Sequence, residues 1–197
     1  MQYFPHAARL SRRRLVAGAG ALLLLASQAR AQSGERLRES LVKAAFLHKF
    51  ASFVEWPDGT FARADAPLRI GVYGDDLVWK DLSELARDRD RDGHPVIVTR
   101  LGPGDSFSGY HILYFKADSP GRMADLLQQV PEGVLTVSDS NGTHPRGCVI
   151  SFYLEEGRVH FGASVEAAAR QKLRLSQRLL SAARMIQGGL DALRLLA

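Results

Sequence analysis

The chain has 197 residues, 46% of them apolar and 24% charged, which is ordinary for a folded globular protein and excludes the disordered and fibrous classes. Its length fits one domain. The formal charge of +5 comes from the first 31 residues, which hold five arginines and no acid, while the remainder has 21 basic and 21 acidic residues. This balance removes the electrostatic argument for nucleic-acid binding.

The first 31 residues have the pattern of a cleaved secretory leader. Three arginines, Arg12–Arg14, precede the apolar stretch Leu15–Ala26 and the small-residue sequence Ala29-Arg30-Ala31. The stretch is shorter than the ~20 residues needed to span a bilayer, so we expect cleavage after Ala31 and a mature domain over residues 32–197. The adjacent arginines also match a twin-arginine signal, and the sequence leaves the export route open.

Apolar residues at helical spacing predict a first helix over Glu35–Trp56, with an apolar face wide enough to be buried on much of its surface. Pro57 disfavours an α conformation at Trp56 and should end the helix there. The indole would then be held in a fixed orientation beside the turn Asp58-Gly59.

Four short apolar segments predict β-strands that alternate with helices. The strands are expected at Leu68–Gly74, Pro95–Leu101, His111–Lys116 and Val134–Asp139. Asp75-Asp76 and Ser119-Pro120 are favourable starts for the helices that follow two of these strands. Near-continuously apolar strands separated by helices are typical of a mostly parallel sheet that is covered on both faces.

The pattern then changes, since the segment Cys148–Ser164 contains two β runs joined at Glu156-Gly157 and predicts a hairpin. The predicted fold class is therefore α/β: a single domain with a mostly parallel or mixed five- to six-stranded sheet and helices on both faces. A last helix is expected from Val165, with Ser164 as its cap and Gly188-Gly189 as its end.

That last helix would combine basic residues with an apolar stripe. The segment contains several basic residues and a single acidic residue, Glu166. The apolar stripe comprises Val165, Ala168, Leu175, Leu179, Ala182 and Ile186. This combination suits a contact surface for a protein or an acidic membrane. A solvated polar face over a core stripe would give the same pattern.

Several short motifs resemble reactive or ligand-binding sites without the rest of the required chemistry. Asp88–Gly93 begins like a calcium loop, but its twelfth position is Thr99 rather than glutamate, so we interpret it as a solvated turn. Ser106 is interpreted as a turn residue, because no base and orienting acid accompany it. His144 and Cys148 lack a second ligand pair, so no metal is expected. The phosphate-binding glycine patterns are missing, and we expect no cofactor.

Three blocks of the sequence resemble the YfiR family of exported bacterial regulators. They are LVKAAFLHKFASFVEWP (41–57), GVLTVSD (133–139) and LRLSQRLLSAAR (173–184). The first block is the most specific, and the order and spacing of the blocks agree with the family over nearly all of the mature chain.

The resemblance implies a periplasmic α/β protein without enzymatic activity that acts by protein contact. The best-known members hold an inner-membrane diguanylate cyclase inactive by binding its periplasmic domain, which lowers cyclic-di-GMP synthesis and biofilm formation. A sensor kinase is a second possible partner here. In the family an outer-membrane lipoprotein can sequester the repressor, and homodimers are typical.

The chain departs from the family pattern at two places. Tyr110 occupies a position where family members commonly carry a cysteine, and Cys148 is the only cysteine, so no internal disulfide can form. The segment after the final predicted strand, residues 160–169, lacks an asparagine that is frequent in the family.

We expect partner contacts through residues at the ends of the two terminal helices: Phe50, Phe53, Trp56, Leu179 and Arg184. Each of these could equally belong to the core, because periodicity does not say which face is outward.

The alternative function is a periplasmic small-ligand-binding module. A parallel sheet offers a crevice at the carboxyl ends of its strands, here near Gly74-Asp75, Lys116-Ala117 and Asp139-Ser140. A hydrolase that uses Ser106 is a third hypothesis, and a Ser106→Ala variant would test it.

Overall fold

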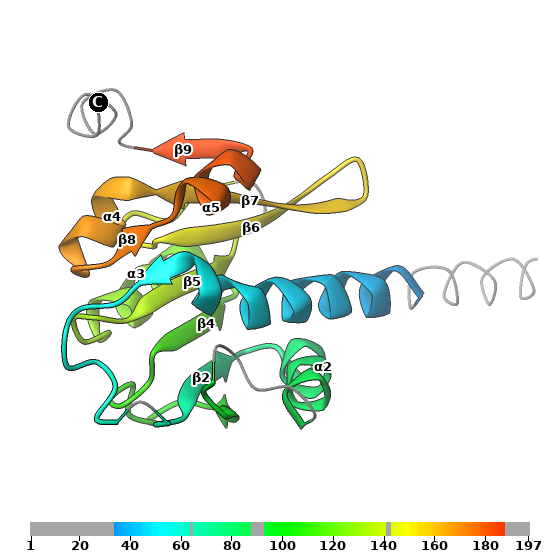
Figure 1. Cartoon of the computed structure of the whole chain (residues 1–197). Helices are drawn as coiled ribbons and strands as arrows, with labels where there is room; N and C mark the ends of the chain where they lie inside the picture. The colour runs from blue at the N-terminus through cyan, green and yellow to red at the C-terminus, as the bar shows by residue number, and fades with distance from the viewer. Residues whose placement is uncertain (1–33, 64, 88–92, 141–142, 188–197) are drawn as a thin grey trace, which may run out of the picture. The chain divides into compact units, whose positions relative to one another are not determined.

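The computed structural model describes residues 34–63, 65–87, 93–140 and 143–187 (Figure 1). The predicted leader, most of the calcium-like loop and the glycines expected to end the last helix lie outside these residues. Residues 34–50 are helical. The elements that follow are η1 Ala51–Phe53, β1 Val54–Glu55, β2 Leu68–Tyr73, α2 Asp76–Arg87, β3 Val96–Leu101, β4 Ile112–Lys116, α3 Pro120–Gln128, β5 Leu135–Asp139, β6 Ile150–Glu155, β7 Arg158–Ser164, α4 Val165–Arg170, β8 Arg174–Leu175, α5 Gln177–Ala182 and β9 Met185–Gln187. Within the described residues, no helix has the length and hydrophobicity needed to cross a membrane.

Seven strands form the main sheet, in the order β3-β2-β4-β5-β6-β7-β9. The strands from β3 to β6 are parallel, β7 returns antiparallel to β6, and β9 lies parallel to β7. The predicted α/β class and mixed sheet are confirmed. The sheet has one strand more than the five to six that were predicted. The additional strand is the short β9, which lies in a segment predicted to be helical. A separate two-stranded sheet joins β1 to β8.

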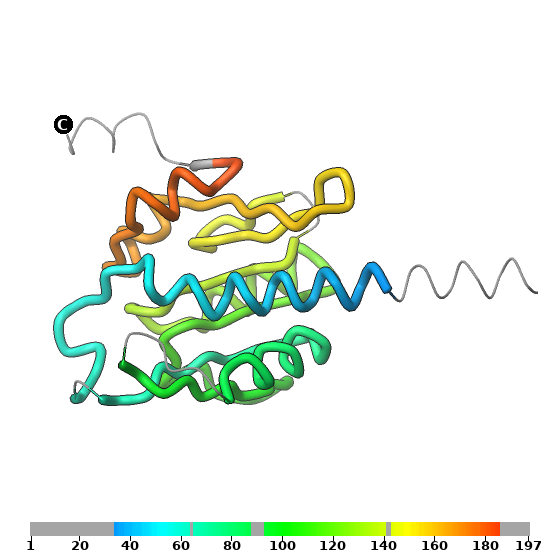
Figure 2. Tube along the Cα trace, turned by 45° about the vertical axis from the view of Figure 1, so that its right-hand side comes forward, coloured from blue at the N-terminus to red at the C-terminus, as the bar shows by residue number. Residues whose placement is uncertain are grey.

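Helices cover both faces of the main sheet, as predicted. In β4, Ile112 and Tyr114 point to one face while Leu113 and Phe115 point to the other, and all four are buried. The first face shares a core cluster with the first helix and α2, and the second face packs against α3. Figure 2 shows residues 39–50 of the first helix running along the strands.

Four phenylalanines fix the first helix on the β6–β7 hairpin. Phe46 and Phe50 come from the helix, and Phe152 and Phe161 come from the paired strands. Their ring centroids lie 5.2 to 6.0 Å apart in stacked, tilted and edge-on arrangements, which are favourable geometries for aromatic pairs. The wide apolar face predicted for this helix is therefore largely used inside the domain.

The first helix ends at residue 50, well before its expected end at Trp56. A 3-10 turn, η1, follows, and Val54–Glu55 becomes strand β1. The cause lies far along the chain, since the Ser176 N–H donates to the Phe53 carbonyl at 2.9 Å and Val54 pairs with Leu175. Pairing with a distant segment overrides the local helical pattern. In Figure 2 the orange segment around β8 lies beside the cyan segment of β1.

The prediction of one continuous last helix is wrong. Helix α4 does begin after Ser164, whose hydroxyl accepts a hydrogen bond from the Ala167 N–H. Lys172 then takes a left-handed conformation with a φ of 57°, which interrupts the helix. Strand β8, helix α5 and strand β9 follow, and Ser176 caps α5. The predicted apolar stripe is therefore divided among several elements.

Candidate functional site

A cluster of charged side chains lies at the carboxyl ends of the parallel strands. Lys43 of the first helix is 1% exposed, and its ammonium donates to Asp139, the last residue of β5, at 2.8 Å. Glu39, one turn earlier on the helix, accepts from the same ammonium. A buried charge is tolerated only when it is paired and hydrogen-bonded, and here two carboxylates supply both requirements.

The cluster extends across the sheet through three further residues, Asp75, Tyr114 and Lys116. The Lys116 ammonium lies 2.9 Å from Asp75 and 3.6 Å from Asp139. The Tyr114 hydroxyl donates to both carboxylates at 3.3 Å. Burial, with the two carboxylates, raises the pKa of Tyr114 well above its usual value, so the hydroxyl remains a donor. We call these residues, with Glu39, Lys43 and Asp139, the carboxyl-edge ion cluster.

Asp75 also connects this cluster to helix α2. Its carboxylate accepts a hydrogen bond from the Val78 N–H at 3.2 Å, which makes it the capping residue expected there. Burial is the largest effect on Lys116 and opposes its charged form, but the hydrogen bond to Asp75 and the charges of the nearby carboxylates together outweigh burial and raise its pKa. The cluster thus joins the first helix, α2 and the ends of β4 and β5.

A cavity of about 560 Å³ lies next to the cluster, at the carboxyl ends of β2, β3 and β4. Strands β2 and β4 are neighbours, but the chain leaves β2 for a helix on one face and β4 for a helix on the other. Such a switch point is where open α/β sheets bind ligands. Gly74, Lys116 and Ala117 of the predicted crevice line this switch-point cavity, together with Arg100 and Arg122. Asp75, Asp139 and Ser140, which were also predicted, are not among its lining residues.

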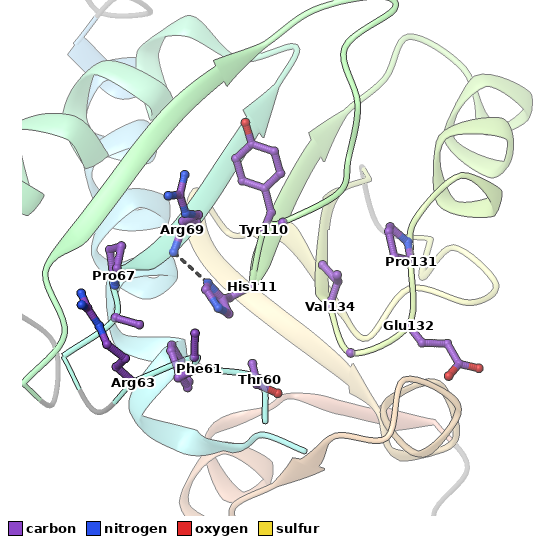
Figure 3. Close-up of a pocket in the computed structure, with 14 residues that line it drawn as sticks. Thr60, Phe61, Arg63, Pro67, Arg69, Tyr110, His111, Pro131, Glu132 and Val134 are labelled. Carbon is purple, nitrogen blue, oxygen red and sulfur yellow. Dashed lines mark hydrogen bonds between the residues drawn. The ribbon is translucent and has the colours of Figure 1, made fainter. Parts of the chain in front are cut away.

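A second cavity, of about 590 Å³, lies at the opposite edge, where β2, β4 and β5 begin (Figure 3). We call it the amino-edge cavity. It lies between residues 60–63 and 66–67 on one side and the turn 131–134 on the other, with His111 between the two sides in Figure 3. Arg63, Arg69 and Tyr110 are among its lining residues.

An aromatic stack anchors the loop that forms one wall of the amino-edge cavity. The Phe61 ring lies between His94 and His111, with centroid distances of 4.3 and 4.6 Å and interplanar angles of 25° and 14°. Trp56 meets Phe61 edge-on at 6.2 Å. The Thr60 hydroxyl donates to the Pro57 carbonyl at 2.7 Å, which closes the turn before the stack. The wall is thus preformed.

His111 is held neutral at this edge by its surroundings. Its Nδ1 accepts a hydrogen bond from the Arg69 N–H at 2.9 Å, which requires that this nitrogen carry no proton. Burial lowers the pKa of His111, and a hydrogen bond to the Thr60 backbone only partly opposes this. The permanent positive charge at the cavity therefore comes from its arginines.

The five predicted contact residues lie in different environments. Phe50 and Leu179 are each 2% exposed and belong to the core, so they could touch a partner only after rearrangement. Phe53 and Trp56 are half-buried, and Arg184 is exposed. A role in partner binding stays a prediction for all five, but only the last three offer surface.

The structure also places the residues that resemble reactive groups. Ser106 lies in a turn, where its hydroxyl accepts a hydrogen bond from the Ser108 N–H at 3.2 Å. The Ser151 hydroxyl meets Nδ1 of His144 at 2.6 Å, a nucleophile–base pair that sequence reasoning missed. Ser151 is 3% exposed and lines neither of the two large cavities, which favours a loop-anchoring role.

The predicted His144–Cys148 pair meets through backbone rather than through the thiol. Nε2 of His144 lies 2.7 Å from the Cys148 carbonyl, and the Cys148 side chain is buried. Burial raises the pKa of the thiol to about 11. Among the described residues, no group of three or more histidine, cysteine or acidic side chains is arranged to hold a metal.

The sheet order, the helices on both faces and the switch-point cavity define an α/β domain of the doubly wound class. The chain belongs to the YfiR/HmsC-like family, whose sequence profile matches residues 40–184. Members of this family are periplasmic regulatory proteins rather than enzymes. No curated protein matches the chain.

The structure gives a physical reason for the three blocks that carry the resemblance. Lys43, in the first block, pairs with Asp139, which ends the second. Strand β8, in the third block, pairs with β1, which ends the first. Sequence reasoning missed both contacts. The available signal was a lysine inside an otherwise apolar helical motif and an acid directly after a buried strand.

Proposed function

We propose that the protein is a periplasmic repressor that binds the periplasmic domain of an inner-membrane diguanylate cyclase or sensor kinase and so lowers cyclic-di-GMP signalling. Membership of the YfiR/HmsC-like family over residues 40–184 is the observation that carries the proposal. An outer-membrane lipoprotein that relieves repression, and a homodimeric state, belong to the same proposal.

The surface supports a mode of action by contact. Leu41 and Val42 on the outer side of the first helix are 51% and 40% exposed, although the opposite side of that helix is fully buried. Arg184 adds an exposed cation near the end of the domain. Protein interfaces combine an apolar centre with enriched arginine, so exposed side chains of both kinds are compatible with partner binding.

The direct test measures cyclic-di-GMP formation by a full-length cyclase of the same organism in lipid nanodiscs, with and without the purified protein. We expect inhibition that saturates as the protein concentration rises. Arg184→Glu should weaken inhibition at least tenfold, whereas Arg158→Glu, the same charge change on another exposed arginine, should not. Unchanged cyclase activity at tens of micromolar wild-type protein would rule out this target.

The switch-point cavity supports the second candidate function, a small-ligand-binding module. Its size of about 560 Å³ lies within the usual range for ligand sites. A thermal-shift screen separates the two functions, because a ligand that binds only the folded state raises Tm. Stabilisation by the cyclase domain without any small-molecule shift favours repression by contact.

A further inference from the structure

We propose that the amino-edge cavity is a docking pocket for an acidic segment of the partner protein, which inserts an apolar side chain and places a flanking carboxylate on Arg69. This inference rests on the proposed function, because it names the chemistry by which the partner is recognised. It is carried by the shape, charge and rigidity of the cavity.

The inner surface of the cavity is suited to an apolar side chain. Phe61, Pro67 and Pro131 supply apolar surface, and the buried Val134 also lines the cavity. A volume of about 590 Å³ holds a large side chain with room for adjoining backbone. Transfer of such a side chain from water into the cavity favours binding.

The charges at the opening select a carboxylate. Within the described part of the chain, no carboxylate forms an ion pair with the Arg69 guanidinium. Arg63 lies 3.2 Å from Asp65, but both side chains are exposed, so water screens this pair and leaves Arg63 able to exchange partners. Glu132, on the facing turn, lies 2.6 Å from Lys172, but both of these side chains are also exposed, so this pair is screened in the same way and only partly offsets the charge of Glu132. An arginine without a partner favours a planar carboxylate.

The walls are ordered before a partner arrives. Phe61 is fixed between His94 and His111, and the Nδ1–H of His94 donates to the Ala66 carbonyl at 2.6 Å. The Ala66 N–H in turn donates to the Arg63 carbonyl at 3.0 Å. A preformed pocket lowers the entropy lost on binding, which is why a short segment is sufficient.

Continuity with Trp56 favours a protein segment over a free small molecule. The indole is half-buried and touches Phe61, the residue that forms the cavity wall. A chain whose anchor occupies the cavity can therefore continue over Trp56, one of the residues predicted to contact a partner.

The first experiment measures the Kd of the cyclase periplasmic domain by calorimetry for the wild type, Arg69→Glu and Arg158→Glu. We expect Arg69→Glu to raise Kd at least tenfold and Arg158→Glu to leave it within twofold, because both variants change the net charge equally. Wild-type binding with no difference between the variants would overturn the docking pocket and leave the proposed function standing. Circular dichroism of each variant confirms that its fold is retained.

The second experiment does not depend on the cyclase. The ¹⁵N-labelled protein is titrated with the peptide acetyl-Asp-Leu-Trp-Asp-amide and, as a control, with acetyl-Lys-Leu-Trp-Lys-amide. The acidic peptide should shift the amide signals of the non-proline residues in 60–69 and 131–134, and Arg69→Glu should abolish those shifts. If both peptides act equally, or neither shifts these signals, the pocket does not recognise acidic segments, whatever the cyclase assay gives.

Discussion

Lys43 is a buried lysine whose charge is balanced by carboxylates from its own helix and from β5. Lys43→Met keeps most of the side-chain volume but leaves Asp139 without its closest cation. We expect the free energy of unfolding to fall by about 3 kcal/mol, at the lower end for a broken buried pair because Lys116 remains 3.6 Å from Asp139. Urea denaturation monitored by circular dichroism measures this loss.

Lys49→Met is the matched control, since Lys49 is exposed on the same helix. It should change the free energy of unfolding by no more than about 0.5 kcal/mol. Equal effects of the two substitutions would mean that the Lys43–Asp139 pair does not stabilise the fold.

Cys148 is the only cysteine, and its thiol is buried with a pKa of about 11. The thiolate is the reactive form, so both burial and the raised pKa protect the side chain. At pH 8 we expect the native protein to react with Ellman's reagent only as fast as it unfolds. In 8 M urea one thiol per chain should react within minutes. Rapid reaction of the native protein would show that the β5–β6 region opens readily.

The side chains of the carboxyl-edge ion cluster were the least predictable part of the candidate site. Lysine and aspartate are expected at the surface, so the apolar neighbours of Lys43 were the one local signal for its burial. Its position depends on Asp139 and Glu39 being near, and only the folded chain brings Asp139 there. By contrast, the caps Asp75, Ser119 and Ser164 were predictable, because capping is a local interaction.

Among the connecting elements, the turn between β2 and α2 tolerates the least change. Gly74 has a φ of 79°, and a Cβ added there would lie 2.1 Å from the Lys116 carbonyl oxygen. Gly74→Ala should therefore lower the free energy of unfolding by more than about 3 kcal/mol, because strain and a backbone clash act together. Thermal unfolding would show this as a fall in Tm.

Gly59→Ala separates these two causes. Gly59 has a φ of 81° but no atom within 4 Å of an added Cβ. Only the left-handed strain of about 1–2 kcal/mol remains. If the free energy of unfolding decreased by the same amount in both variants, the close approach of the Lys116 carbonyl to Gly74 would not contribute to the effect of Gly74→Ala.

Elements with local signals were predicted well, whereas those defined by distant pairing were not. The strands β2 to β7 have apolar runs bounded by turn residues, and all were expected. Strands β1 and β8 are short and lie in segments with helical periodicity, so nothing local distinguishes them from helix. They become strands because they pair with each other in the folded chain. The same reason explains why one long last helix was expected.

On the scale of the whole molecule, stability should depend on pH through His111 and His144. Burial lowers the pKa of both below the value of 6.5 that they have when exposed. As the pH falls through 6.5, the unfolded chain takes up protons that the folded chain does not, so the free energy of unfolding decreases. We expect these two histidines not to lower the free energy of unfolding above pH 7, and to lower it progressively as the pH falls below 6.5.

Urea denaturation at pH 7.5 and 5.5 measures this slope. His111→Phe keeps an aromatic ring beside Phe61 and removes one titrating group. The free energy of unfolding of this variant should therefore decrease less between pH 7.5 and 5.5 than that of the wild type. A lower stability at pH 7.5, of about 1 kcal/mol or more, is expected from the lost acceptor for the Arg69 N–H. An unchanged slope would assign the dependence to other groups.

The overall class was predictable because apolar strands alternate with helices, but the strand order was not. The chain moves from β3 at one edge, past β2, to β4, and this crossing creates the switch point. The amino-edge cavity escaped sequence reasoning entirely, since its residues come from three separate loops and, in Arg69, from strand β2. Neither the loops nor the crossing leaves a periodic signal.

The pairing of β1 with β8 has a consequence for how the polypeptide is made. The ribosome releases Val54 long before Leu175, so the end of the first helix has no β-partner until most of the chain has emerged. Folding that waits for such a remote contact is slow compared with local helix formation. Nascent chains should therefore stay accessible to holding chaperones until synthesis is nearly finished.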